Sequence, residues 1–241
     1  MTAVDGVAAV GADVAHEGTA LQKTARKLAT MTRDSVKTVI AASMVGTAIE
    51  FYDFYAYGTA AANYFPKVFF GQTGAAALIG SLLTFAVAFI ARPVGSLIFG
   101  HFGDRMGRKT TLVVSLMTMG VATFLIGCLP TYAVWGGWAV VLLVACRFVQ
   151  GIGLGGEWSG AAMVATENAP DDKRALYGSF PELGAPIGFF LSNGTYFLLE
   201  TFTDSDDMLA WGWRVPFLLS AVLVIVGLVV RVRMEETPVF R

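Results

Sequence analysis

Charged residues are scarce in this sequence: they make up 15% of its 241 residues, whereas soluble domains carry about 25%. Hydrophobic residues make up 55%, and the mean hydropathy is +0.63. So few charges cannot cover the surface of a water-soluble protein, which indicates that lipid is the solvent for much of the surface. The net charge of −1 gives no indication of a nucleic-acid partner.

Cysteine and histidine are also rare, with two residues of each. Cys128 and Cys146 both fall in apolar runs, so they are interpreted as small core residues and not as a disulfide or metal framework. His16 and His101 lie far apart, so they predict no metal site. The sequence also lacks a Ser/His/Asp constellation, an HxxxH pair, a CxxC motif and a phosphate-binding loop. We therefore expect a protein that is not an enzyme and that uses no cofactor.

Long apolar runs are what the sequence has instead. A helix needs about 20 apolar residues to cross the hydrocarbon core of a bilayer, and six runs are long enough. The runs do not alternate as the strands of a membrane β-barrel would, so we predict an all-α membrane protein with six transmembrane helices. The predicted spans are Thr38–Ala62, Gly74–Phe99, Thr110–Leu129, Trp138–Val164, Ala175–Leu199 and Gly212–Val230.

Basic residues predict the orientation of these spans, because cytoplasmic loops carry an excess of Lys and Arg. Most of the 17 basic residues lie in the N-terminal tail, in the second and fourth loops and at the C-terminal end. The opposite loops contain only Lys67, so both termini are predicted to be cytoplasmic. Residues 1–36 are predicted to be a disordered tail and not a signal peptide, because Asp5 and Asp13 interrupt any apolar run.

Ionisable side chains within the spans are candidate functional residues, because they are costly at membrane depth. At about 1.5 Å per residue, Asp53 in the first span and Arg147 in the fourth each lie roughly 14 Å from the external end of their span. This similar depth makes Arg147 a candidate partner for Asp53 or Glu50. The spacing of Glu50, Asp53 and Tyr57 places all three on one face of a helix.

A second set of charges, formed by Arg92, Glu157 and Glu182, lies nearer the predicted cytoplasmic ends. Each set has two acids and one arginine, so one carboxylate in each set would lack a partner charge. A buried carboxyl group of this kind tends to bind a proton. We hypothesise that Asp53 or Glu50 carries a proton and that Arg147 tunes it, the alternative being that these charges only fix helix packing. For the second set we favour packing or gating.

A glycine-rich segment with one acid and three cations separates the second and third spans. We predict a short cytoplasmic loop in which Asp104 caps the start of the third span, since a helix N-terminus stabilises a carboxylate by about 0.3–1 kcal/mol. The cations can bridge to acids on neighbouring helix ends. The residues of this predicted gating loop are Gly100, Asp104, Arg105, Gly107, Arg108 and Lys109.

The GxxxDRxGRK pattern of this segment resembles the loop between the second and third helices of the major facilitator superfamily. Further motifs, taken together and in order, resemble the metabolite:proton symporter family, which takes up small organic solutes such as shikimate, α-ketoglutarate, proline and betaine. The resemblance covers roughly residues 37–241. The further motifs are Gly46–Gly58, Arg92–Gly95, Arg147–Glu157, Trp211–Phe217 and Glu235–Phe240.

This resemblance implies two three-helix inverted repeats, over residues 37–234, that form the N-terminal half of a twelve-helix transporter in the bacterial inner membrane. Residues 235–241 would begin the central linker. The resemblance also implies that the gating loop latches the two halves together. In the fourth helix it implies a functional motif in which Gln150 and Gly151 follow Arg147. Because transport occurs between the halves, a second six-helix half or a homodimer is an expected partner.

The leading functional prediction is proton-coupled uptake of a small organic metabolite by alternating access, with the lipid bilayer, the solute and protons as partners. Arg147 favours a carboxylate or a zwitterion, because a guanidinium group pairs well with a carboxylate. Two alternatives remain open: an uncoupled facilitator of the same fold, and an inactive or regulatory six-helix fragment.

Overall fold

The computed structural model describes residues 41, 43–106, 108–156 and 174–232. All of them lie within one compact unit, Val39–Arg241, and the description below concerns that unit alone. The predicted disordered tail, the predicted linker and Glu157 lie outside the described residues.

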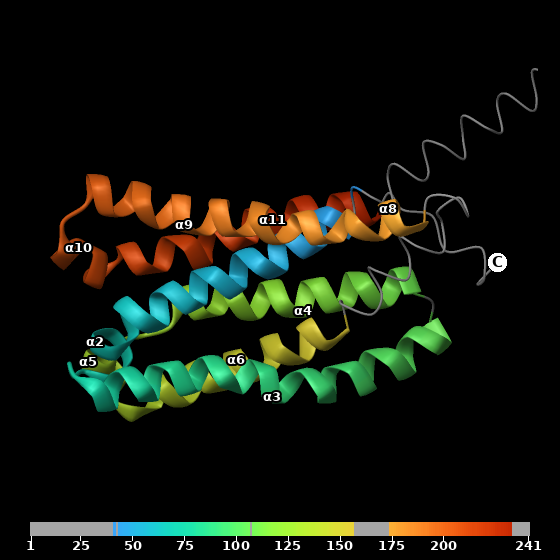
Figure 1. The fold of residues 1–241 in the computed structure, drawn as a ribbon. Helices are drawn as coiled ribbons and strands as arrows, with labels where there is room; N and C mark the ends of the chain where they lie inside the picture. Colours follow the sequence, from blue (N-terminus) through green and yellow to red (C-terminus); the bar gives the residue numbers. More distant parts are fainter. Residues whose placement is uncertain (1–40, 42, 107, 157–173, 233–241) are drawn as a thin grey trace, which may run out of the picture. The chain divides into compact units, whose positions relative to one another are not determined.

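Every regular element of the described residues is a helix (Figure 1). The first helix covers residues 43–63. The elements after it are α2 (Phe65–Phe70), α3 (Ala75–Met106), α4 (Arg108–Cys128), α5 (Tyr132–Trp135), α6 (Gly137–Gly155), α8 (Arg174–Ser179), η2 (Pro181–Leu183), α9 (Gly184–Phe202), α10 (Ser205–Ala210), η3 (Gly212–Arg214) and α11 (Val215–Val232).

Four segments in the described part of the chain are long and apolar enough to cross a membrane. Three match the second, third and sixth predicted spans, and one covers the first part of the fourth, whose end at Val164 lies outside the described residues. The first predicted span corresponds to the first helix. The fifth is helical but interrupted, because Pro181 lacks the N–H that would continue the helix, and α9 begins only at Gly184. The four segments are Ala75–Gly103, Thr110–Cys128, Gly137–Gly155 and Gly212–Val230.

The predicted gating loop is wrong in its extent. Gly100, Asp104 and Arg105 belong to α3, which continues to Met106, and α4 already begins at Arg108. Asp104 therefore lies in the last turn of α3 and not in a loop before α4. Hydropathy predicts where the apolar part of a helix ends. The helix itself extends as far as its backbone hydrogen bonds can form, and polar residues and glycines do not prevent this. A glycine costs a helix only about 1 kcal/mol, which is too little to end one of this length.

Glycines set how closely the long helices pack. A Cβ atom on Gly151 of α6 would lie 2.3 Å from the carbonyl oxygen of Ala88 in α3, and one on Gly95 of α3 would lie 2.1 Å from that of Ile152 in α6. The backbones of α3 and α6 are therefore in direct contact. Gly188 similarly brings α9 against the first helix, since its Cβ would lie 2.6 Å from the backbone nitrogen of Tyr52.

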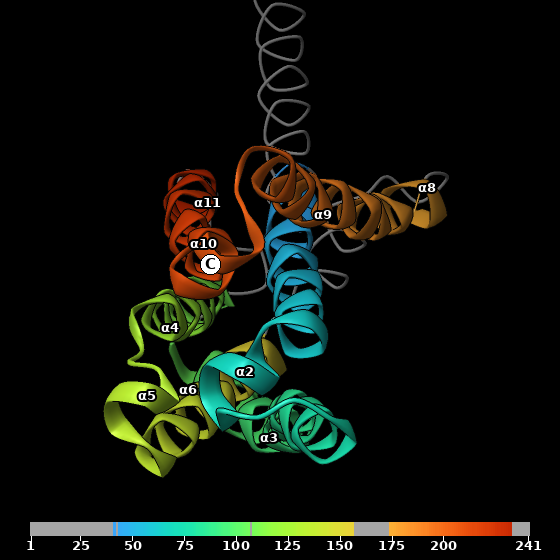
Figure 2. The same cartoon turned by 90° about the vertical axis from the view of Figure 1, so that its left-hand side faces the viewer.

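The first helix lies between α9 and α3 when the unit is viewed along the helices (Figure 2). Its side chains contact both neighbours, as the ring contacts of Phe54 with Phe85 of α3 and of Tyr55 with Phe189 of α9 show. The first helix therefore presents different side chains to α3, to α9 and to the interior of the bundle.

Candidate functional site

A buried polar cluster joins three helices inside the bundle. Each of its members is at most 2% exposed. The first helix supplies the acid and the phenol, α4 supplies a hydroxyl, and α6 supplies the amide and the guanidinium group. The cluster consists of Asp53, Tyr57, Thr123, Arg147 and Gln150.

Gln150 lies at the centre of this cluster. Its Nε2 donates to Thr123 Oγ1 at 2.7 Å and reaches Asp53 Oδ2 at 3.5 Å. Its Oε1 accepts a hydrogen bond from Arg147 Nη1. One amide thus connects the carboxylate of the first helix with the guanidinium group of its own helix. The sequence marked Gln150 only as part of a motif, because the connection depends on how α6 faces the first helix.

Thr123 has two acceptors for one hydroxyl hydrogen. Its Oγ1 lies 2.7 Å from Asp53 Oδ2 and 3.0 Å from the carbonyl oxygen of Met119, one helical turn earlier in α4. The hydroxyl can therefore donate to a charged Asp53, or turn to Met119 when Asp53 needs no donor. Sequence reasoning missed Thr123; a hydroxyl within an apolar span was the only signal available.

Aromatic rings surround the guanidinium group of Arg147. Its central carbon lies 3.7 Å from the ring centroid of Tyr57 and 5.1 Å from that of Phe85. The Tyr57 hydroxyl is in turn 2.6 Å from Thr84 Oγ1 in α3. Ring faces attract a cation, and the attraction is strongest where water is excluded. Tyr57 itself is fully buried and contacts Arg147.

The predicted grouping of the charges is wrong for Glu50 and Arg92. Arg92 Nη2 lies 3.2 Å from Glu50 Oε1, so this acid pairs with α3 and not with Arg147. The Glu50 side chain is 4% exposed and that of Arg92 is 29% exposed. Glu182, one of the two acids placed in the same predicted set as Arg92, is exposed in η2. Depth along a helix does not specify which neighbouring helix a side chain faces, and this is why the grouping failed.

The remaining predicted residues lie apart from the cluster or next to it. Gly151 is where α6 contacts α3. Arg105 is exposed at the end of α3, whereas Arg108 and Lys109 begin α4. Gly107 lies outside the described residues.

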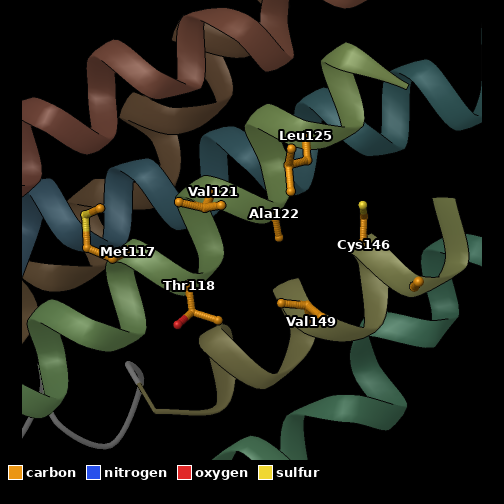
Figure 3. Close-up of a pocket in the computed structure, with 8 residues that line it drawn as sticks. Met117, Thr118, Val121, Ala122, Leu125, Cys146 and Val149 are labelled. Atoms are coloured by element: carbon orange, nitrogen blue, oxygen red, sulfur yellow. The ribbon is translucent and has the colours of Figure 1, made fainter. Parts of the chain in front are cut away.

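An apolar pocket of about 440 Å³ lies between α4 and α6 (Figure 3). Thr118 is its one side chain with a hydroxyl group, and that hydroxyl donates to the carbonyl oxygen of Val114 at 2.8 Å. The lining therefore offers nothing to orient a polar solute. The lining residues are Met117, Thr118, Val121, Ala122, Leu125, Ala145, Cys146 and Val149.

Comparison with known sequences places the chain among transporters. Residues 38–241 match the family described as "Sugar (and other) transporter". Over 86% of its length the chain is 62% identical to the Escherichia coli protein named inner membrane metabolite transport protein YhjE, and the match covers 47% of that protein. It is 46% identical to the Escherichia coli shikimate transporter, over 82% of this chain and 45% of the relative.

A proline/betaine transporter of Salmonella typhimurium is 41% identical over 86% of this chain and 41% of its own length. The chain thus spans about half the length of the curated relatives it matches. Among solved structures, the crystal structure of a D-xylose-proton symporter matches with a TM-score of 0.75 at 19% identity, over 85% of this chain and 49% of that chain. This likeness shows the fold, and it confirms the predicted all-α architecture of a multi-pass membrane protein.

Proposed function

The chain belongs to the sugar (and other) transporter family of the major facilitator superfamily, and from this premise we propose that it is one half of a proton-coupled transporter. Its family consists of transporters and not of enzymes. In the proposed function, a small organic solute, either a carboxylate or a zwitterion, enters the cell together with a proton by alternating access. The proposed orientation has both termini in the cytoplasm of a bacterium, with the helices in its inner membrane.

The observation that carries this proposal is the position of Asp53. Its carboxylate is buried between three helices, accepts a hydrogen bond from Thr123 of α4, and is connected through Gln150 of α6 to the cation of Arg147. A rigid-body movement of these helices would change its donors and its access to water. Proton binding at Asp53 would then depend on the conformation of the transporter, as proton-coupled transport requires.

The surroundings of Asp53 suit two protonation states. While Asp53 is charged, Thr123 donates to it and the nearby Arg147 balances its charge. When Asp53 holds a proton, the Thr123 hydroxyl can turn to the carbonyl oxygen of Met119. We assign the coupled proton to Asp53 and not to Glu50, because Glu50 already forms an ion pair with Arg92.

A partner is part of the proposal, because the chain spans about half the length of its relatives. Solute would bind between this unit and either a second six-helix half or a second copy of the chain. The proposed solute class agrees with the names of two relatives, which are a shikimate transporter and a proline/betaine transporter.

Uptake by cells that produce the chain tests this proposal. In a strain without its own shikimate, α-ketoglutarate and betaine uptake, we expect accumulation of at least one of these labelled solutes, and an uncoupler should abolish it. Asp53→Asn should remove the uncoupler-sensitive part, whereas Asp206→Asn, a change of an exposed acid in α10, should not.

Other outcomes would support the alternatives. Uptake that survives the uncoupler would indicate an uncoupled facilitator. No uptake, with the protein shown to be in the membrane, would rule out a transporter formed by copies of this chain alone, and would leave either a half that needs a second six-helix half or a regulatory fragment. Uncoupler-sensitive uptake by the Asp53→Asn variant would show that another group carries the proton.

A further inference from the structure

Six aromatic side chains form a continuous patch where the first helix meets α3 and α9. The Phe54 ring centroid is 5.0 Å from that of Phe85 and 5.3 Å from that of Tyr55, whose ring is 5.1 Å from that of Phe189. None of the six is fully buried, which distinguishes the patch from the aromatic core around Trp213. We name this patch the aromatic wall: Phe51, Phe54, Tyr55, Phe85, Phe89 and Phe189.

The position of the wall separates it from the lipid-facing surface of α3. The most exposed large side chains of α3 are aliphatic, namely Leu83, Ile90 and Leu97. The rings of α3 that belong to the wall contact the first helix instead, in the region where the first helix lies between α3 and α9 (Figure 2). Phe89 and Phe189 remain 43% and 44% exposed, so the wall has ring surface available to a ligand.

Arg92 adds a cation at the edge of the wall. Its guanidinium carbon lies 5.0 Å from the ring centroid of Phe89, and 29% of its side chain is exposed. Its Nη2 donates to Glu50, and its Nε is buried without a hydrogen bond within the described part of the chain, so donors for a ligand must come from the remaining Nη hydrogens. A guanidinium group has five N–H donors, so Arg92 can hold Glu50 and still bind a carboxylate.

From this arrangement we propose that the aromatic wall and Arg92 bind the solute, and that they select a net-neutral zwitterion that carries a carboxylate and a quaternary ammonium group. Arg92 would take the carboxylate, and the ring faces would take the ammonium group through cation–π attraction. Because Glu50 balances Arg92, a net-neutral solute leaves no excess charge at the wall, whereas a dianion does. This proposal rests on the proposed transport function, since it names the solute class of that site.

Binding without a proton gradient tests the wall independently of transport. The purified chain in lipid nanodiscs is examined by saturation-transfer difference NMR with two probes of the same shape. Glycine betaine carries the quaternary ammonium group, and tert-butylacetate has carbon in place of that nitrogen. We expect saturation transfer from the protein to the N-methyl protons of glycine betaine. We also expect an affinity for glycine betaine about tenfold higher than for tert-butylacetate.

Matched variants identify the residues responsible. Phe54→Leu and Phe189→Leu should each weaken glycine betaine binding several-fold with little effect on tert-butylacetate, whereas Tyr55→Phe should retain binding. Arg92→Lys should weaken both probes, because both carry the carboxylate. Phe197→Leu, which changes an exposed ring of α9 outside the wall, is the control and should change neither. An unchanged thermal unfolding midpoint for each variant would show that its fold is retained.

Three results would overturn this proposal: equal affinity for the two probes, equal effects of Phe54→Leu and Phe197→Leu, or no signal from glycine betaine. A chain that binds glycine betaine through the wall but takes up no solute would retain this proposal and lose the proposed function. If uptake of glycine betaine is sensitive to the uncoupler but is unaffected by the wall variants, the proposed function is retained and this proposal fails.

Discussion

Two amino-acid side chains, Gln150 and Arg92, determine how the buried charges of this unit are balanced. Gln150 connects Arg147 to Asp53 through its neutral amide group, and the rings of Tyr57 and Phe85 lie against the same cation. Arg92 forms an ion pair with Glu50 at the edge of the aromatic wall. A buried ion pair contributes little net stability, but removing one partner is costly, because the other charge stays in a medium of low polarity.

Arg92→Gln should therefore destabilise the fold, because it removes the cation that pairs with Glu50. Since Arg92 is partly exposed, we expect a loss of about 1–3 kcal/mol, less than for a fully buried pair. The double variant Glu50→Gln/Arg92→Gln should recover part of this loss. Unfolding of the purified protein in detergent, followed by circular dichroism, measures all four members of the cycle. Additive effects of the two single changes would show that the pair is not coupled.

At the scale of the element, direct backbone contact positions the helices that carry the cluster. α3 supplies Thr84, Phe85 and Arg92, and α6 supplies Arg147 and Gln150. The distance between these two helices therefore affects the contacts of Arg147 with Phe85 and of Tyr57 with Thr84 and Arg147. Glycines of both helices set that distance, since any Cβ at these positions would meet backbone atoms of the other helix.

Gly151→Ala should force α3 and α6 apart, because the added Cβ would lie 2.3 Å from the carbonyl oxygen of Ala88. Overpacking of this kind costs about 1–3 kcal/mol, so the midpoint of thermal unfolding should fall. Gly194→Ala is the matched control: it lies within α9 with no atom within 4 Å of the added Cβ. The control should leave stability unchanged or raise it by up to about 1 kcal/mol, since alanine favours a helix. Equal midpoints for the two variants would contradict close packing at Gly151.

At the scale of the whole molecule, the distribution of basic residues predicts which side of the membrane each helix end faces. Lys67 in α2 and Arg105 in α3 are both exposed. Lys67 lies near the start of α3, whereas Arg105 lies at its end. They should therefore face opposite sides of the membrane, with Arg105 in the cytoplasm.

Cysteine labelling in intact cells tests this orientation. In a background with Cys128→Ser and Cys146→Ser, Lys67→Cys should react with a membrane-impermeant maleimide added outside. Arg105→Cys should react only after the cells are permeabilised. The reverse pattern would place the termini outside the cell, and labelling of both sites from outside would show that α3 does not span the membrane.

The sequence by itself determined the class of the protein, the bounds of the second, third and sixth spans closely, and the charged residues worth examining. Hydropathy, helical spacing and charge bias are local properties, so they can be read without knowing which helices are neighbours. Only the tertiary structure decided that Glu50 pairs with Arg92, that Gln150 connects Arg147 to Asp53, and that rings of three helices form one wall. Those outcomes depend on the rotation and crossing of the helices, which close glycine contacts and side-chain packing across the bundle set together.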